Sequence, residues 1–287
     1  MNEKMNDDKP IFILCVGTQK AGTSWLRKQL NKHSRINMGF IKEYNVLENI
    51  IPTSKPFPAP RNDHWTKRMT NVQREVRNRM LHNDEIYENY FASLINDDIK
   101  YTGDFTVRSV SFDKNAYNVI KTKLEKVGFS VKVIFLMRDP VERNWSSLRM
   151  YAGRPFHNKS NRLIPFPGAT APLLEDECIE DHFKSFYSNA YANIYTAYNN
   201  IIPTLRESFN REDLYIGFYE TLFTDDSFDN ISKFLGIDFG YADKNEKIFV
   251  SPVVPLSDAS ANECKQYYSN VYNYCAAEFP ITNQLWS

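Results

Sequence analysis

The sequence lacks two features that would point to a membrane or to the cell exterior: a long apolar run and a dense set of cysteines. No run approaches the roughly 18 apolar residues that a membrane span needs, and the polar residues 1–10 precede no signal-peptide core. The four cysteines are too widely spaced for a disulfide framework or a zinc site. We therefore expect a cytoplasmic protein with reduced thiols and a flexible segment over residues 1–10.

An excess of charge of either sign is also absent, because 35 basic residues balance 35 acidic ones. No global field draws this chain to nucleic acid or to an anionic membrane, so any anion site must be local. The five histidines show no spacing typical of metal ligands, and we predict no metal site. Hydrophobic residues make up 42% of the chain, which is enough to bury a core.

Apolar runs alternate with helical patterns along the chain, and this alternation predicts the fold class. Buried strands are expected over residues 11–16 and 131–137, further strands over 36–41 and 214–219, and an extended segment over 99–105. Helices are expected from Pro140 and over residues 22–33, 65–95, 115–127, 173–209 with a break at Pro203, 228–235 closed by Gly236, and 257–277. This order predicts one α/β domain over residues 11–287, a P-loop-like three-layer fold with a central, mainly parallel sheet flanked by helices. Prolines predict loops over residues 52–60 and 152–172, and we expect substrate contacts in the second.

The most informative segment runs from Gly17 to Trp25, where a glycine-bounded loop leaves a buried strand and opens a helix. Such a loop presents several backbone N–H groups to an anion, which predicts a phosphate cradle. A nucleoside triphosphatase would have lysine directly after the second glycine, but this chain has Thr23 there. The cation stands instead at Lys20, inside the turn. A tight turn with only a structural role is the alternative interpretation.

The loop resembles the first nucleotide loop of sulfotransferases that use 3′-phosphoadenosine 5′-phosphosulfate (PAPS), with a lysine, a glycine, two hydroxyl residues and often a tryptophan. After strand 131–137, Arg138 with Ser146 eight residues later resembles the family's 3′-phosphate motif. The resemblance implies that PAPS, or its product adenosine 3′,5′-bisphosphate (PAP), is bound by Gly17, Lys20, Ala21, Gly22, Thr23, Ser24, Trp25, Arg138 and Ser146. Trp25 would stack on adenine, or it is a core residue. A helix-start ion pair is the alternative role of Arg138, and we expect Arg143 in a surface ion pair.

Two further parts of the resemblance are weaker. The segment from Leu214 to Leu222, with Glu220, and the Phe-Leu-Gly sequence from Phe234 look like the family's strand and helix end, and we interpret them as scaffold. Many cytosolic members also hold the 3′-phosphate with an Arg-Lys-Gly segment near the C-terminus. This chain has no such triplet, and Lys244 or Lys247 would have to substitute for it.

The Lys42-Glu43 pair is similar to a segment that heparan sulfate and related carbohydrate sulfotransferases place near the acceptor hydroxyl. Glu43 is therefore the candidate base, and Asp104 is the competing carboxylate. A glutamate with an ordinary pKa of about 4.3 is a poor proton acceptor for an alcohol, so burial would have to raise that pKa. A pair with Lys42 would oppose this shift. Solvated or structural carboxylates are the alternative at both positions.

The resemblance implies in-line transfer of the sulfuryl group of PAPS to a hydroxyl of a small-molecule or carbohydrate acceptor, without a metal. Lys20 and the amides from Gly22 to Trp25 would stabilise charge on the departing oxygen. One alternative is a P-loop kinase or nucleotide hydrolase, which needs a strand-end aspartate for magnesium, and Asp139 is the candidate. Another is a non-catalytic nucleotide-binding protein. The sequence does not identify the acceptor or the oligomeric state.

Overall fold

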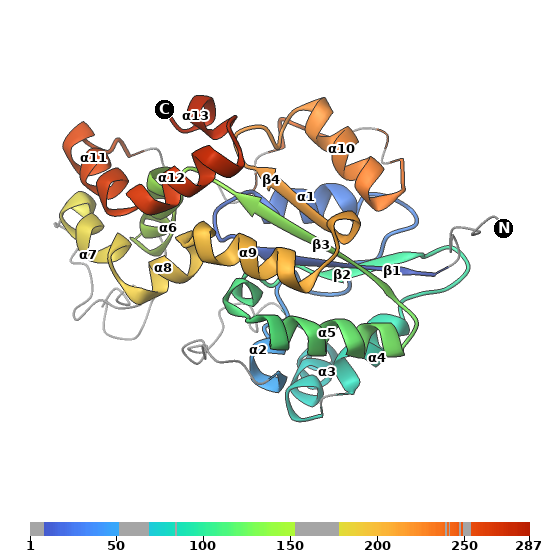
Figure 1. Cartoon of the computed structure of the whole chain (residues 1–287). Helices are drawn as coiled ribbons and strands as arrows, with labels where there is room; N and C mark the ends of the chain where they lie inside the picture. The colour runs from blue at the N-terminus through green and yellow to red at the C-terminus, as the bar shows by residue number, and fades with distance from the viewer. Residues whose placement is uncertain are drawn as a thin grey trace.

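A computed structural model gives the protein a four-stranded sheet between two layers of helices (Figure 1). The structure describes residues 9–51, 69–83, 85–152, 178–238, 240, 242–246, 248 and 254–287. The first eight residues of the expected flexible segment lie outside the described residues. So do the expected loop over 52–60 and residues 153–172 of the second expected loop.

All the paired strands of the sheet are parallel, in the order β2-β1-β3-β4. They comprise β1 (Ile11–Gly17), β2 (Tyr101–Asp104), β3 (Ser130–Met137) and β4 (Leu214–Phe218). The expected α/β class and parallel sheet are therefore confirmed. The strand order changes direction between β1 and β3, and in such sheets ligands bind beyond the carboxyl ends of the strands at this switch point.

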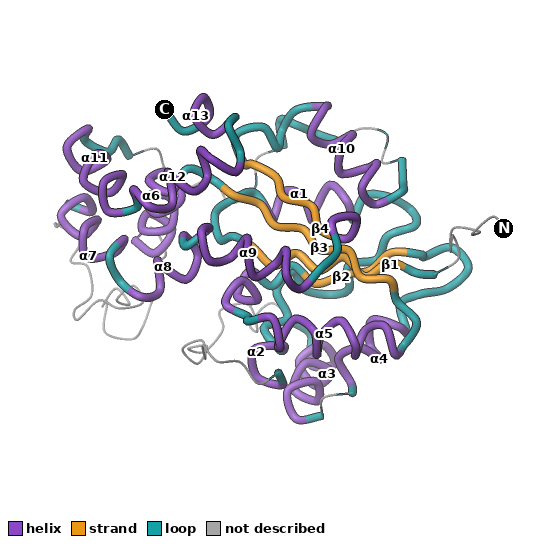
Figure 2. Tube along the Cα trace, viewed as in Figure 1, coloured by secondary structure: helices purple, strands orange, loops and turns teal. Residues whose placement is uncertain are grey.

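Successive side chains of β1 enter different cores, because strand side chains alternate between the two faces of a sheet. Phe12 and Leu14 pack into the core under α5 (Lys114–Lys126) and α9 (Tyr198–Ser208). Ile13 packs into the core under α1 (Thr23–Leu30) and α10 (Asp225–Leu235), where it is buried with Cys15, Leu26 and Ile231. Figure 2 shows the strands between these two helical layers. Burial on both faces explains why β1 and the second half of β3, residues 133–137, are continuous apolar runs.

The remaining helices surround the carboxyl edge of the sheet and one of its faces (Figure 1). They are α2 (Leu47–Ile50), α3 (Asn71–His82), α4 (Ile86–Ala92), α6 (Pro140–Ala152), α7 (Phe183–Tyr187), α8 (Ala190–Thr196), α11 (Asp258–Tyr267), α12 (Ser269–Glu278) and α13 (Thr282–Leu285), with short 3₁₀ turns η2 (Val107–Ser111), η3 (Ile179–His182) and η4 (Arg211–Asp213). As expected, α6 begins at Pro140 and α10 ends at Gly236, which has a left-handed φ of 68°. In the described part of the chain, none of these helices has the length and hydropathy to span a membrane.

The expected strand over residues 36–41 is wrong. Only Ile36 pairs with β2, through an isolated bridge to Tyr101. The guanidinium of Arg27 takes up the carbonyls of Met38 (3.0 Å), Gly39 (3.3 Å) and Ile41 (3.0 Å), and Gly39 has a positive φ of 67°. The segment therefore cannot continue along the sheet, and it turns towards the carboxyl end of β1.

Three expected long helices are divided in the structure. The expected helix over residues 65–95 is divided into α3 and α4. The last helix breaks at Tyr268, which is buried and donates a hydrogen bond to the carbonyl of Tyr187 (2.6 Å).

The expected helix over residues 173–209 is divided as well, but not at Pro203, because α9 continues through that residue. A new helix begins instead after Asn189, whose Oδ1 accepts from the amide of Ala192 (2.9 Å).

Candidate active site

Two segments that are far apart in the sequence meet beyond the carboxyl ends of β1 and β3. The Nη1 of Arg138 donates to the carbonyl of Lys20 (3.3 Å), so the end of β3 contacts the loop after β1 directly. The Arg138 guanidinium also lies over the ring of Tyr219, 4.2 Å from its centroid, and forms an ion pair with Glu142 (3.1 Å). The helix-start ion pair weighed for Arg138 is thus present together with the contact to the loop. Glu142 is half-exposed in this pair, and such pairs contribute little to stability.

The loop after β1 has the backbone geometry of an anion cradle. Lys20 and Gly22 have positive φ values of 70° and 83°, and Gly22 precedes the first turn of α1. A Cβ on Gly22 would lie 2.4 Å from Cδ2 of Leu222, so a side chain there would have to displace Leu222 as well as adopt a strained φ. Gly22 provides no side-chain cap, so the first-turn amides and the dipole of α1 favour a negative charge at this helix end. Other predicted nucleotide-binding residues also lie in this loop and at the start of α1. Ala21 and Thr23 are buried there, and Ser24 is half-buried.

The first part of the loop is fixed from behind by α6 and α8. Thr18 Oγ1 donates to the carbonyl of Tyr195 (2.6 Å), and Gln19 Nε2 donates to the hydroxyl of Tyr191 (3.1 Å). Ser147 Oγ donates to Gln19 Oε1 (2.6 Å). The sequence analysis missed Ser147 and named its neighbour Ser146, which is also buried on α6. A role of Ser146 as phosphate ligand stays a prediction.

Trp25 is 3% exposed and packs in the core under α1. Its ring makes edge-on contacts with Phe223 and Phe228 at centroid distances of 5.0 and 6.0 Å, and its Nε1 donates to the carbonyl of Asp243 (3.1 Å). The core alternative for Trp25 is thus realised. Stacking on adenine stays a prediction, and it requires one of these neighbours to move away from the ring.

Lys42 and Glu43 lie beside the loop. Lys42 Nζ is 2.7 Å from Glu43 Oε1 and 3.2 Å from Thr23 Oγ1. The ion pair expected from the sequence is therefore present. The side chain of Glu43 is 22% exposed, so it is accessible to an acceptor. Arg27 positions this segment through the preceding carbonyls, a contact that the sequence analysis did not foresee.

Asp104, the competing carboxylate, ends β2 and is fully buried. Its Oδ1 accepts from Thr106 Oγ1 (2.6 Å) and its Oδ2 from the hydroxyl of Tyr87 (2.8 Å). Burial raises the pKa of Asp104 to about 6, although these two hydrogen bonds oppose the shift. Thr106 Oγ1 in turn accepts from the amide of Asn45 (3.3 Å). Asp104 thus ties β2 to the segment that carries Glu43, and no part of it is exposed to an acceptor.

Arg143, near the end of β3, has other contacts than those expected from the sequence. Arg143 was expected in a surface ion pair, but it is fully buried, donates to Asn144 and the carbonyl of Ala192, and lies near the ring of Tyr195. Its place on the inner face of α6, three residues after Pro140, explains this burial.

Asp139, the magnesium ligand of the kinase alternative, caps α6 instead. Its Oδ1 accepts from the amide of Glu142 (2.9 Å) and its Oδ2 from the hydroxyl of Tyr272 (2.7 Å). Burial raises the pKa of Asp139. The amide of Asp139 donates to Glu220 Oε1 (2.8 Å), so Glu220 has the scaffold position expected for it. Lys244 forms an ion pair with Asp225 at the start of α10, and Lys247 lies outside the described residues.

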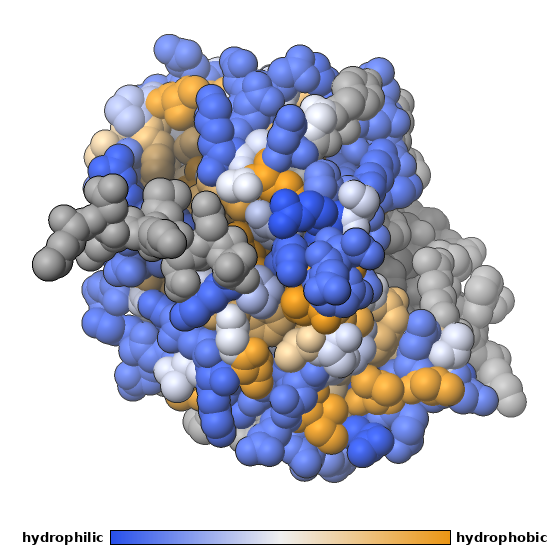
Figure 3. Space-filling model, turned by 90° about the vertical axis from the view of Figure 1, so that its right-hand side faces the viewer, coloured by the Kyte–Doolittle hydropathy of each residue, from blue (hydrophilic) through white to orange (hydrophobic). Residues whose placement is uncertain are grey.

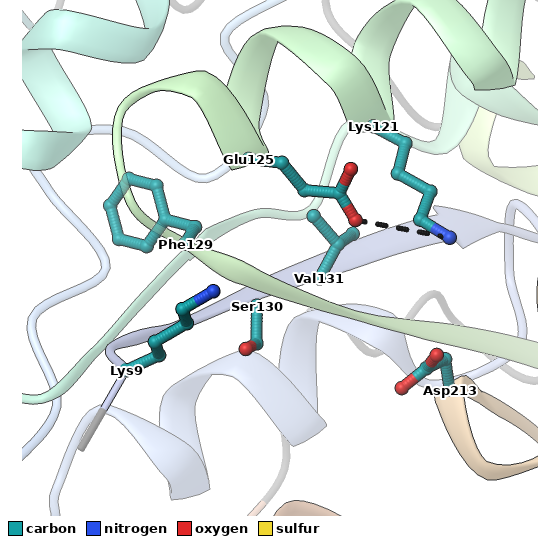
Figure 4. A pocket seen from close by; sticks show the side chains of 7 residues that line it. All are labelled: Lys9, Lys121, Glu125, Phe129, Ser130, Val131 and Asp213. Carbon is teal, nitrogen blue, oxygen red and sulfur yellow. Dashed lines mark ion pairs between the residues drawn. The ribbon is translucent and has the colours of Figure 1, made fainter. Parts of the chain in front are cut away.

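A hollow of ≈ 300 Å³ lies at the opposite end of the sheet, where β3 begins (Figure 4). Lys9, Ser130 and Asp213 line it, and Lys121 and Glu125 form an ion pair of 3.8 Å in its wall. None of the predicted site residues is among its lining residues. The face that Figure 3 shows is mostly hydrophilic, with apolar residues in smaller groups. The mixed charges in the hollow favour neither an anion nor a cation, so the candidate site remains at the carboxyl edge.

Comparison with known proteins assigns the family. The chain matches the Sulfotransferase family over residues 10–239, a range that includes the loop after β1, Glu43, Asp104 and the end of β3. The chain therefore belongs to the sulfotransferase family and is an enzyme of that family. No curated protein matches its sequence closely enough to count as a relative.

Solved structures agree with the fold. A sulfotransferase from Alicyclobacillus acidocaldarius is 15% identical, with a TM-score of 0.59 and coverage of 92% of this chain and 94% of that chain. Weaker similarity extends to the sulfotransferase domain of the Synechococcus PCC 7002 olefin synthase (13% identity, TM-score 0.45, 93% of this chain and 98% of that chain). It also extends to the mouse sulfotransferase SULT7A1, complexed with PAP (14%, 0.41, 92% and 65%). The first of these structures confirms the predicted α/β sulfotransferase fold.

Proposed function

We propose that this enzyme transfers the sulfuryl group of PAPS to an acceptor hydroxyl, with Glu43 as the base. The observation that carries this proposal is the contact of Arg138 with the carbonyl of Lys20. It brings the cation at the end of β3 next to the loop after β1, as binding of a nucleotide with two separated phosphate groups requires. Family membership supports the sulfuryl-transfer chemistry.

The residues on the donor side fit such a nucleotide. The positive φ values of Lys20 and Gly22 give the loop the backbone geometry of an anion cradle, and the close packing of Gly22 on Leu222 favours glycine at this turn. The Arg138 guanidinium has a planar fork that matches phosphate oxygens in pairs, and its present partner Glu142 is a solvated carboxylate that a phosphate can replace. We assign the 5′ side of the nucleotide to the cradle and Lys20, and the 3′-phosphate to Arg138 and Ser146.

PAPS supplies an activated sulfuryl group on its 5′-phosphate. The acceptor oxygen forms a bond to sulfur while the bond from sulfur to the bridging oxygen breaks, and the electron pair of that bond stays on the phosphate. Glu43 takes the proton of the acceptor hydroxyl. Lys20 and the amides at the start of α1 stabilise the charge on the departing oxygen, which is the larger part of the protein's contribution.

Glu43 is preferred to Asp104 as the base because a base must be within hydrogen-bond reach of the proton that it abstracts. Glu43 is partly exposed beside the donor loop, whereas Asp104 is fully buried and both of its oxygens already accept hydrogen bonds. We assign Asp104 the role of positioning the Glu43 segment through Thr106 and Asn45. For the acceptor we propose a carbohydrate or glycoconjugate, on the resemblance of the Lys42-Glu43 pair to that of carbohydrate sulfotransferases.

Calorimetric titration with PAP and with ATP, each with and without magnesium, tests the donor half. We expect PAP to bind without magnesium and Arg138→Ala to weaken this binding by about 10-fold to 100-fold, because charge-assisted hydrogen bonds are lost. Arg211→Ala, on an exposed turn, is the matched control. Binding of ATP with magnesium, but not of PAP, would support the kinase alternative.

Transfer of label from PAPS to a panel of sugars, phenols and lipids tests the acceptor half. Labelled sugars are the expected product. Labelling of phenols or lipids alone would overturn the carbohydrate assignment and retain the sulfotransferase. Tight binding of PAP with no transfer to any member of the panel would favour the non-catalytic alternative.

A further inference from the structure

A lysine outside the nucleotide loop reaches into it. Lys42 Nζ donates to Oγ1 of Thr23 (3.2 Å) and contacts Oε1 of Glu43 (2.7 Å). Thr23 belongs to the donor loop, and Glu43 is the base proposed above. One ammonium group therefore links the donor side of the site to its acceptor side.

The position of Thr23 gives this contact a chemical meaning. In nucleoside triphosphatases the residue directly after the second glycine is the lysine whose ammonium reaches the phosphate to be transferred. This chain has the short Thr23 there, and the ammonium of Lys42 lies at hydrogen-bond distance from the end of its side chain. Lys42, from another segment, thus supplies a cation at position 23, where the sequence has a threonine in place of that lysine.

The backbone around Lys42 is held in place independently of any ligand. Arg27 binds the carbonyls of Met38 and Ile41, and the amide of Phe105 donates to the carbonyl of Lys42 (3.3 Å). The side chain of Lys42 is 21% exposed, so its charge is partly shielded from water. A fixed backbone with a long, rotatable side chain allows the ammonium to exchange partners without moving the segment.

We propose that Lys42 is the second cation of the donor site and exchanges partners during the reaction. With the sulfuryl group absent, its ammonium holds the Glu43 carboxylate and Thr23. With a sulfuryl donor in the loop, it moves to the non-bridging oxygens of that group and releases Glu43 to accept the proton of the hydroxyl. This inference rests on the proposed function and deepens it.

The exchange follows from the charges of the three groups. A neighbouring ammonium stabilises the charged form of a carboxylate, and a carboxylate held in this way is a weaker base. A sulfuryl donor brings negative oxygens to the loop and competes for the same ammonium, whereas PAP has no sulfuryl group and leaves the pair with Glu43 intact. Lys42 should therefore distinguish PAPS from PAP. The other cations and the cradle amides are assigned to phosphate groups that both nucleotides carry, so they do not make this distinction by charge alone.

The test is a comparison of PAPS and PAP binding by calorimetry, without acceptor, in the wild type and in Lys42→Met, which keeps the length of the side chain and removes its charge. We expect the affinity for PAPS to fall by roughly 10-fold to 100-fold and the affinity for PAP to stay unchanged, because only the sulfuryl group loses a charge-assisted partner. Lys42→Arg should restore part of the difference. Lys184→Met, at an exposed lysine on α7, is the matched control.

Turnover gives a second measurement, with the affinity for PAP as the internal reference. In Lys42→Met the loss should appear in kcat and in the affinity for PAPS but not in the affinity for PAP, because only the sulfuryl oxygens lose the ammonium. Maximal kcat should fall by about 100-fold.

Equal losses of PAPS and PAP affinity, or no loss of either with an unchanged kcat, would overturn the role of Lys42. These results are distinguishable from failure of the proposed function. If the wild type binds neither nucleotide, both proposals fall, whereas wild-type binding and transfer with an indifferent Lys42→Met variant removes only this inference.

Discussion

The donor side and the acceptor side of the site are built in different ways. The donor side consists of two short segments, each directly after a buried parallel strand, and the register of β1 with β3 brings their ends together. The acceptor side is assembled by side chains from distant segments, with Arg27 and Asp104 holding the chain around Glu43. Backbone geometry therefore dictates the first, while tertiary contacts dictate the second.

The largest expected effect separates the two carboxylates of the acceptor side. Glu43→Gln should lower kcat by about 10²-fold to 10⁴-fold with little change in PAP binding, since the variant loses general base catalysis and keeps the donor site. Steady-state kinetics with a hydroxyl acceptor, together with PAP titration, measure both quantities. Asp104→Asn should retain far more activity at a temperature at which it stays folded. The reverse order of the two variants would make Asp104 the base.

The donor side is tested by Lys20→Ala. Loss of a cation directed at the departing oxygen should lower kcat by about 100-fold to 1,000-fold, and the fold should be unchanged because Lys20 lies half-buried in a surface loop. Circular dichroism and single-turnover kinetics check the two parts of this prediction. Lys28→Ala, on the exposed face of α1, is the control. Substantial activity in Lys20→Ala would remove this lysine from the mechanism.

The smallest effect is a change in the free energy of unfolding with pH. It concerns Asp104, the buried carboxylate, and so sharpens the contrast with the accessible Glu43. Burial raises the pKa of Asp104 from its ordinary value of 3.8 to about 6 in the folded protein. Its stabilising contribution is therefore fully present below pH 3.8 and is lost as the pH rises through about 6. The shift of about two units corresponds to roughly 3 kcal/mol.

Asp104→Asn removes this dependence. Relative to the wild type, the free energy of unfolding of the variant should increase by up to roughly 3 kcal/mol between pH 4 and pH 7. Urea denaturation at several pH values measures the difference, with Asp97→Asn on an exposed turn as the control. A difference between variant and wild type that is constant with pH would show that Asp104 has an ordinary affinity for protons. Glu48, whose pKa burial raises from 4.5 to about 7, should leave a pH dependence of the same sign and of similar size in both proteins, so it cancels in the difference between them.

The sequence was sufficient to predict the features that depend on local patterns. The apolar run from Ile11, the glycine-bounded loop after it and the start of α6 at Pro140 each have a cause within a few residues of chain. The fold class and the convergence of Lys20 with Arg138 follow from these, because parallel strands bring their carboxyl ends to one edge.

The features that the sequence did not predict depend on contacts between distant residues. The segment from Ile36 to Ile41 has the pattern of a strand, but its carbonyls accept from Arg27 and its amides donate to other side chains instead of to the sheet. The burial of Arg143, the contact of Ser147 with Gln19 and the approach of Lys42 to Thr23 likewise leave no periodic signal. An expected element can thus have the right composition and still be displaced by a side chain from another segment.

The contacts of Arg27 also restrict how such an enzyme can diversify. One arginine, a single turn into the helix that opens the donor cradle, ties that helix to the stretch that ends at Glu43. In the proposed mechanism, this contact fixes Glu43 relative to the helix that stabilises the leaving group, as an in-line displacement requires. On this proposal, a change of acceptor is more easily made in the side chains around Glu43 than in the Arg27 contacts that set its distance from the cradle.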